Sequence, residues 1–229
     1  MGDMTKTLAF DTSTKFLSIA LFEGDVLKRE YHKEAGITHS AVLIPTIKNE
    51  IDALSWKISD IGLIAVGSGP GSFTGLRIAA ATVKALSAAV GCKIMGVPGM
   101  DAMAARYRTD EKYIAPLLDA RKGKVYSCFY EKPDQAFVRR GDFLLVTLAE
   151  LLRMMDKKTI FFGDGVGPYR SEIEKCANAS IDPDADWYPR ASEIGRIGIE
   201  KAKTGTDDPE TFEPLYLHPK ECNITCKRS

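Results

Sequence analysis

Two short segments of this sequence carry residue types that could bind phosphate and a divalent cation. In the first, Asp11-Thr12-Ser13-Thr14, a carboxylate that ends an apolar stretch is followed by three hydroxyls. A carboxylate can hold Mg²⁺, and hydroxyls and turn amides can donate hydrogen bonds to phosphate oxygens. The alternative is a turn in which Asp11 accepts hydrogen bonds from its neighbours' amides. The second segment, Gly163-Asp164-Gly165, has the same two interpretations, a backbone approach to a ligand or a turn.

A glycine-rich loop, SGPGSFTGLR at 68–77, precedes a helix whose free amides could receive an anion. The loop lacks the Gly-Lys-Ser/Thr of a P-loop, and Thr74 stands where GxGxxG requires its third glycine. Ser72 or Thr74 is suited to cap the helix. Arg77 falls in the first turn, where a cation opposes the helix dipole, so we expect an acidic partner from the protein or from a ligand. Thr74 and Arg77 are therefore the candidate anion contacts.

The alanine-rich helix behind this loop, expected over 74–90, has two opposed apolar faces because successive residues turn by about 100°. The larger side chains share one face: Leu76, Ala79, Val83, Leu86 and Val90. The second face carries Ile78, Ala81, Ala85 and Ala88. A helix that is apolar on both sides is normally buried on both sides. We expect the first face to cover a sheet and the second to meet either a helix expected at 40–54 or another protein chain.

The elements that must position these residues repeat along the chain. Residues 8–25 and 114–134 each contain an apolar strand that ends in an aspartate, a polar turn and a second strand, with Asp11 and Asp119 in the same place. Two hairpins can look alike by chance, but the repeat favours two related domains, and helices between buried strands indicate an α/β fold. The cleft between two such domains is a common ligand site.

Composition excludes several classes of function. Thirty-one basic residues balance 31 acidic ones, which argues against an independent nucleic-acid site. No apolar run approaches the roughly 18 residues of a membrane span, so we expect no membrane contact. The five cysteines are scattered, which is typical of a reducing compartment and predicts a cytoplasmic protein. Cys222 and Cys226 lack further ligands for a metal site, and neither HExxH nor GxSxG occurs.

The ordered motifs LAFDTST, AVGSGPGSFTGLRI, LLDARKGKVY and GDG resemble those of the TsaB (YeaZ) family over about residues 5–220, and GPGSFTGLR is the most specific of them. The resemblance implies two related domains of the actin/Hsp70/sugar-kinase ATPase-like (ribonuclease H-like) fold. We place an N-terminal domain at 5–108, a smaller C-terminal domain at 109–220 and a tail at 221–229.

The resemblance also implies a function. The family provides a non-catalytic scaffold or activator subunit for threonylcarbamoylation of adenosine 37 in tRNA (t6A). It acts by binding a TsaD-type transferase, with a TsaE-type ATPase in the same assembly. A homodimer is implied when the chain is alone, and contact with tRNA only through the complex. Neither a catalytic residue nor a resident metal is implied, and nucleotide binding is limited to weak binding of Mg-ATP or ADP.

The residues that the resemblance assigns fall into two sets. The partner interface lies on the helices expected at 40–54 and 74–90: His39, Leu43, Ile47, Ile78, Ala81, Thr82, Ala85 and Ala88. Six residues match loops that bind nucleotide in this fold and are interpreted as vestigial: Asp11, Thr12, Ser13, Gly163, Asp164 and Gly165.

One pattern separates the chain from the related transferase. TsaD carries a metal-binding HxxxH motif, and the matching stretch here is GVPGMDAM, which places Gly99 and Met103 at the histidine positions. Neither side chain ligates iron or zinc as an imidazole does. The alternative function is an ATP-dependent phosphotransferase or ATPase of the same fold, whose turnover would depend on Asp11. A metallopeptidase has no motif to support it.

Overall fold

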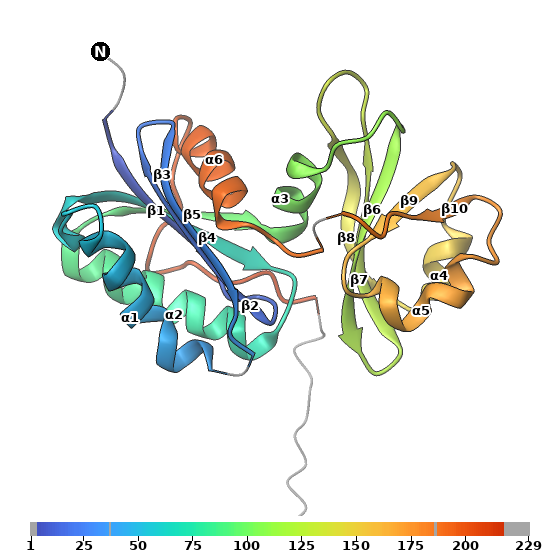
Figure 1. Ribbon diagram of the computed structural model, residues 1–229, viewed down its shortest axis with the longest axis horizontal. Coiled ribbons are helices and arrows are strands. Elements are labelled where there is room, and N and C mark those ends of the chain that lie inside the picture. The colour runs from blue at the N-terminus through green and yellow to red at the C-terminus, as the bar shows by residue number, and fades with distance from the viewer. Residues whose placement is uncertain (1–3, 37, 186, 218–229) are drawn as a thin grey trace, which may run out of the picture.

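The computed structural model describes residues 4–36, 38–185 and 187–217, which form two halves lying side by side (Figure 1). The first half is built on a sheet of five strands: β1 (Lys6–Asp11), β2 (Phe16–Glu23), β3 (Val26–Glu34), β4 (Ile61–Gly69) and β5 (Lys93–Pro98). The second half is built on five more: β6 (Tyr113–Arg121), β7 (Lys124–Glu131), β8 (Val138–Val146), β9 (Thr159–Phe162) and β10 (Ala179–Ile181).

The two sheets have the same topology. Their strand orders are β3-β2-β1-β4-β5 and β10-β9-β6-β7-β8, so the first strand of each half is central. That strand pairs antiparallel with the next strand in sequence and parallel with the fourth. The internal repeat predicted from Asp11 and Asp119 is therefore confirmed, and so is the two-part α/β fold of the actin/Hsp70/sugar-kinase, ribonuclease H-like class.

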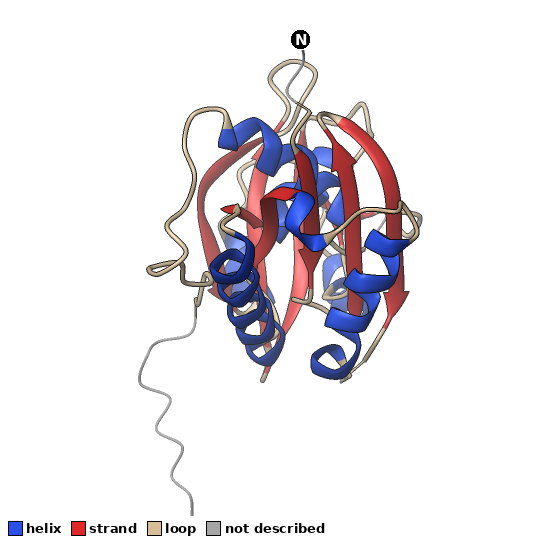
Figure 2. Ribbon diagram, turned by 90° about the vertical axis from the view of Figure 1, so that its left-hand side faces the viewer, coloured by secondary structure: helices blue, strands red, loops and turns tan. Residues whose placement is uncertain are grey.

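Helices cover both faces of the first sheet. The helices are α1 (His39–Asp52), α2 (Phe73–Val90), α3 (Gly99–Arg106), α4 (Leu148–Arg153), α5 (Val166–Ile173) and α6 (Ala191–Ala202), with a 3₁₀ turn, η1, at Ile58–Asp60. Helices α1 and α2 lie on one face of the first sheet and α6 on the other, while α3 lies between the halves (Figure 1). Figure 2 views the molecule from the side of the first half and shows helices (blue) on both sides of the strands (red).

Successive side chains of a strand point to opposite faces, so the two faces of the first sheet carry different residues. Leu8 and Phe10 of β1 pack in the cluster with α1 and α2, whereas Ala9 packs in the cluster with α6. Helix α6 comes unusually close to the sheet, because a Cβ at Gly195 would lie 2.2 Å from the Phe22 ring, and one at Gly198 would lie 2.5 Å from the Cβ of Ala65. The two glycines of α6 make this contact possible.

The predicted boundaries placed residues 109–220 in the second half, but the C-terminal segment does not belong to it. After β10 the chain crosses back, and α6 packs on β1, β2, β4 and β5. Beyond α6, the Asp207 amide donates to the Ile94 carbonyl at 3.0 Å and the Leu215 amide to the Ser68 carbonyl at 2.8 Å. Residues from α6 to 215 therefore lie with the first half. The predicted tail, 221–229, lies outside the described residues.

One helix within the described residues, α2, is long and apolar enough to cross a membrane by length and composition alone. Its mean hydropathy is 1.3, and 28% of its residues are buried. A core helix of a soluble protein passes the same test, so this is weak evidence. The helix is interrupted by two charged residues, Arg77 and Lys84.

Candidate functional site

The turn after β1 is held by its own carboxylate. Asp11 is 1% exposed, and its Oδ1 accepts hydrogen bonds from the Ser13 amide at 3.0 Å and the Ser13 hydroxyl at 2.9 Å. Its Oδ2 is buried without a hydrogen-bond partner and lies against Gly67 of β4, where an added Cβ would be 1.9 Å away. The residue thus caps its neighbours, as the simpler of the two interpretations predicted.

Burial raises the pKa of the Asp11 carboxyl from its usual 3.8 to about 6. The two hydrogen bonds from Ser13 and the nearby His39 oppose this shift without cancelling it. Since the folded state then holds the proton more tightly than the unfolded state, this group's contribution to stability is present below pH 4. It is lost as the pH rises through about 6.

We therefore predict that Asp11→Asn removes a pH-dependent loss of stability. Between pH 4 and 7 the wild-type free energy of unfolding should fall, relative to the variant, by on the order of 3 kcal/mol. Urea denaturation at pH 4, 5, 6 and 7 measures this difference. Asp25→Asn, in an exposed turn, is the control and should follow the wild-type curve. Parallel curves for wild type and Asp11→Asn would contradict the prediction.

The glycine-rich loop packs directly onto this turn. The Ser72 amide donates to the Ser13 carbonyl at 2.7 Å, and the Thr12 hydroxyl donates to the Gly75 carbonyl at 2.8 Å. A Cβ at Gly71 would lie 2.4 Å from the Ser13 carbonyl oxygen, and one at Gly75 would lie 1.9 Å from that of Thr12. The glycines allow two backbones to touch, and the hydroxyls of Thr12 and Ser13 are bonded to protein atoms.

The start of α2 corrects the expected role of Arg77. Ser72 is the N-cap, since its hydroxyl accepts from the Gly75 amide at 3.3 Å, and Thr74 is exposed in the first turn. The Arg77 guanidinium stacks on the Phe73 ring, 3.9 Å from its centroid. No carboxylate of the described residues pairs with it, so the expected acidic protein partner is absent there. An anion contact by Thr74 and Arg77 stays a prediction.

The Gly163-Asp164-Gly165 turn is attached to β6 as the glycine loop is attached to β1. The Gly165 amide donates to the Leu117 carbonyl at 2.9 Å, and Asp164 Oδ1 accepts from the Asp119 amide at 3.0 Å. Gly163 has φ +114°, and a Cβ there would lie 2.4 Å from the Leu117 carbonyl oxygen. Burial, together with the neighbouring Asp119 carboxylate, raises the pKa of Asp164. This turn follows β9 as the glycine-rich loop follows β4, and the two strands hold equivalent places in the two sheets.

The connector before α6 passes between the two turns. The Tyr188 ring lies 4.5 Å from that of Phe16, and the Lys15 ammonium lies 5.7 Å from the Tyr188 ring. Lys15 also acts electrostatically on Asp164. Pro189 packs on Gly99, where an added Cβ would be 3.0 Å away. The connector thus contacts residues from both halves near the two turns.

The predicted partner residues divide by exposure. Ala81, Ala85 and Ala88 are exposed on α2, and Ile78 and Thr82 are half-buried. His39, Leu43 and Ile47 are 4%, 1% and 3% exposed, so they lie in the core and present no surface to a partner.

Three large exposed side chains near the partner helices were missed from the sequence: Ile44 (49%), Phe73 (53%) and Tyr216 (36%). Ile44 could have been found, because it lies next to the buried stripe of α1 rather than in it.

The positions that replace the transferase histidines are used for packing. Gly99 contacts Pro189, and Met103 is 3% exposed in the cluster that joins α3 to the second sheet. Within residues 4–36, 38–185 and 187–217, no group of three His, Cys, Asp or Glu side chains lies close enough to hold a metal ion. Cys222 and Cys226 lie outside these ranges.

Known proteins share this sequence and architecture. The model of the family described as "TsaD: tRNA N6-adenosine threonylcarbamoyltransferase" matches residues 28–203, more than half of the chain. The tRNA threonylcarbamoyladenosine biosynthesis protein TsaB of Bacillus subtilis is 30% identical over 93% of this chain and 94% of its own length. This chain belongs to the TsaB family.

Two further members support the assignment. TsaB of Escherichia coli is 28% identical over 93% of this chain and 94% of its own length. The solved structure of YeaZ from Pseudomonas aeruginosa superposes with a TM-score of 0.79 at 26% identity, covering 93% of this chain and 100% of the other. The predicted resemblance to TsaB (YeaZ) is therefore confirmed across nearly the whole chain.

Proposed function

We propose that this TsaB-family chain is a non-catalytic subunit in the threonylcarbamoylation of tRNA adenosine and acts by binding a TsaD-type transferase. The observation that carries the proposal is the uncovered face of α2. Ala81, Ala85 and Ala88 are exposed, although the opposite face of the same helix packs on the sheet. Small apolar side chains let a partner helix approach closely, and contiguous apolar patches on a surface mark sites of interaction.

An aromatic and basic cluster extends this face. Phe73 and Arg77 precede Ala81 at steps of four, so the three residues form one ridge of α2. Tyr216 joins the cluster from the C-terminal segment, with its ring 5.4 Å from that of Phe73. Tyrosine and arginine are enriched among the residues that contribute most to binding. The cluster is therefore suited to anchor a partner whose helix lies along the alanines.

The contacts within the turn after β1 support a non-catalytic role. The Thr12 and Ser13 hydroxyls are bonded to the protein, and Asp11 is buried. Phosphate could reach this turn only if the glycine loop moved away, so nucleotide binding should be weak at most. Gly99 and Met103 cannot supply the metal ligands of the transferase whose family model matches the chain.

The net charge of the chain and its membership of the TsaB family indicate the remaining partners. Balanced charge gives no basic surplus for tRNA, so tRNA should be reached only through the complex, in the cytoplasm. A TsaE-type ATPase would join the same assembly. When alone, the chain should pair with itself through the face that the transferase would otherwise cover.

A second candidate is an ATPase or phosphotransferase, favoured by two carboxylates on equivalent central strands, Asp11 at the end of β1 and Asp119 two residues before the end of β6. Calorimetry with millimolar Mg-ATP separates the two functions. Strong binding with turnover that is lost in Asp11→Asn would favour the enzyme, whereas the subunit should give little or no heat.

The proposal is tested by mixing this chain with a TsaD-type transferase and measuring mass by analytical ultracentrifugation. We expect a one-to-one heterodimer, formed at the expense of the homodimer because both would use α2. Two species that sediment independently at tens of micromolar would contradict the proposal.

A further inference from the structure

The exposed face of α2 begins with a cation whose charge is not neutralised within the described chain. Arg77 is exposed in the first turn of this helix, where a positive charge opposes the helix dipole. Within residues 4–36, 38–185 and 187–217, no carboxylate forms an ion pair with it, and its guanidinium contacts the ring of Phe73. The position of Arg77 thus has no electrostatic reason inside the fold.

The acidic side chains around this face are absent or do not pair with Arg77. Helix α2 carries no aspartate or glutamate. Both acidic residues of the neighbouring α1 are paired with other cations: Glu50 with Arg29 at 2.8 Å, and Asp52 with Lys48. The C-terminal segment beside α2 carries Glu210 and Glu213, which are exposed and form no ion pair with Arg77 in the described structure. The charge of Arg77 is therefore available to a carboxylate of another molecule.

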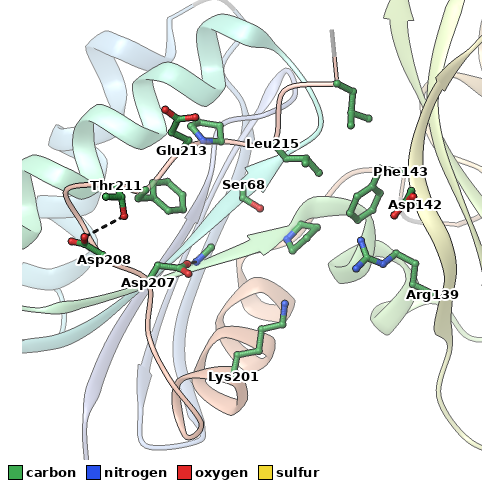
Figure 3. Close-up of a pocket in the computed structure, with 15 residues that line it drawn as sticks. Ser68, Arg139, Asp142, Phe143, Lys201, Asp207, Asp208, Thr211, Glu213 and Leu215 are labelled. Carbon is green, nitrogen blue, oxygen red and sulfur yellow. Dashed lines mark hydrogen bonds between the residues drawn. The ribbon is translucent and has the colours of Figure 1, made fainter. Parts of the chain in front are cut away.

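Stacking holds the Arg77 guanidinium in place. Its carbon lies 3.9 Å from the centroid of the Phe73 ring, and the Tyr216 ring lies 5.4 Å from that of Phe73. The backbone beside Tyr216 is fixed, because the Leu215 amide donates to the Ser68 carbonyl at 2.8 Å. Figure 3 shows Leu215 and Ser68 at the pocket between the halves, on the side of the first half. A guanidinium that stacks through its plane keeps the N–H donors of its edge, where a carboxylate can accept two hydrogen bonds.

A helix packed on the exposed alanines of α2 would pass over this guanidinium. At 100° per residue, Arg77, Ala81 and Ala88 point within about 40° of one another. Arg77 and Ala88 are separated by about 16 Å along the axis, or roughly three turns. The surface therefore fits a helix that has small residues against the alanines and an acidic residue at the end that meets Arg77.

We propose that Arg77 recognises an aspartate or glutamate on the helix of the TsaD-type transferase that packs on the alanine face. The carboxylate would accept two hydrogen bonds from the edge of the guanidinium, which the Phe73 ring already holds in place. A second copy that packed α2 against α2 would bring no carboxylate from that helix, so the pair would favour the transferase over the homodimer. This inference rests on the proposed function and names the chemistry of the partner's surface.

Replacing Arg77 by glutamine tests this pair. Arg77→Gln should weaken binding of the transferase by about tenfold or more, since it removes a charged hydrogen bond, and should change the homodimer little. Titration calorimetry measures the first effect and analytical ultracentrifugation the second. Arg77→Lys keeps the charge without the planar fork, so it should recover only part of the affinity.

The matched control is Arg153→Gln. Arg153 is an exposed arginine in the last turn of α4, on the second half of the chain, where no partner is proposed. This variant should bind the transferase like wild type. Urea denaturation should show all the variants folded.

An exchange of charges identifies the residue of the transferase. Arg77→Glu should weaken binding by about 100-fold, because two carboxylates would then face each other. Each aspartate and glutamate exposed on the helices of the transferase is replaced in turn by arginine. One of these transferase variants should bind wild type weakly and Arg77→Glu tightly.

Three results would overturn the inference while leaving the proposed function intact, because wild type binds the transferase in all of them. The first is binding by Arg77→Gln as tight as that of wild type. The second is equal weakening of the homodimer and of transferase binding, which would show that Arg77 only supports the packing of α2. The third is the absence of any transferase variant that restores binding to Arg77→Glu. Failure of wild type to bind the transferase would instead overturn the proposed function and this inference together.

Discussion

Replacing Ala85 by glutamate should weaken binding of a TsaD-type transferase by about 100-fold or more while the chain stays folded. Ala85 is exposed on α2, so the new carboxylate remains in water in the free chain. In the complex it would be buried without a partner, which typically costs several kcal/mol. The homodimer should be lost as well. Titration calorimetry measures the first effect and analytical ultracentrifugation the second.

Ala149→Glu is the matched control for this experiment. Ala149 is an exposed helical alanine in α4, on the second half of the chain, where no partner is proposed. This variant should bind the transferase and form the homodimer like wild type. If Ala85→Glu binds as tightly as Ala149→Glu, the alanine face of α2 is not the interface and the proposed mode of action is wrong.

Gly75→Ala should destabilise the fold by about 3 kcal/mol, an effect large enough to unfold a marginal domain. The added Cβ would lie 1.9 Å from the Thr12 carbonyl oxygen, and the contact is between two backbones. Neither backbone can yield without breaking the hydrogen bond from the Thr12 hydroxyl to the Gly75 carbonyl. Urea denaturation gives the change in the free energy of unfolding.

Gly167→Ala provides the comparison. Gly167 lies in α5 with nothing within 4 Å of an added Cβ, so alanine there should be neutral or slightly stabilising. Similar stability of Gly75→Ala and wild type would show that the glycine loop is free to move. In that case the turn after β1 could open for phosphate, and the structural interpretation of this loop would fail.

Local patterns predicted much of this fold. The aspartates at 11 and 119 marked equivalent central strands, because the strand before each is buried, although β6 continues for two residues beyond Asp119. The two faces of α2 could be assigned because helical periodicity separates Leu76, Ala79 and Val83 from the alanines. The prediction of a sheet-facing side is confirmed.

Contacts between distant segments could not be predicted in the same way. The return of α6 to the first sheet depends on the fit of Gly195 and Gly198 against residues far away in sequence. Arg77 was expected to have an acidic partner, from the protein or from a ligand, because a cation opposes the helix dipole there, but its guanidinium stacks on the ring of Phe73 one turn earlier.

The buried stripe of α1 shows a second limit. His39, Leu43 and Ile47 repeat along one helical face, and that periodicity marks a buried face without saying whether the sheet or a partner covers it.

Reconstitution of tRNA threonylcarbamoylation tests the central claim most directly. A TsaD-type transferase, a TsaE-type ATPase, tRNA and a threonylcarbamoyl donor are combined with and without this chain, and modified adenosine is quantified by mass spectrometry. The account predicts product only when the chain is present, none from the chain alone, and none when Ala85→Glu replaces it. Full modification without the chain, or modification by the chain alone, would contradict a required and non-catalytic role.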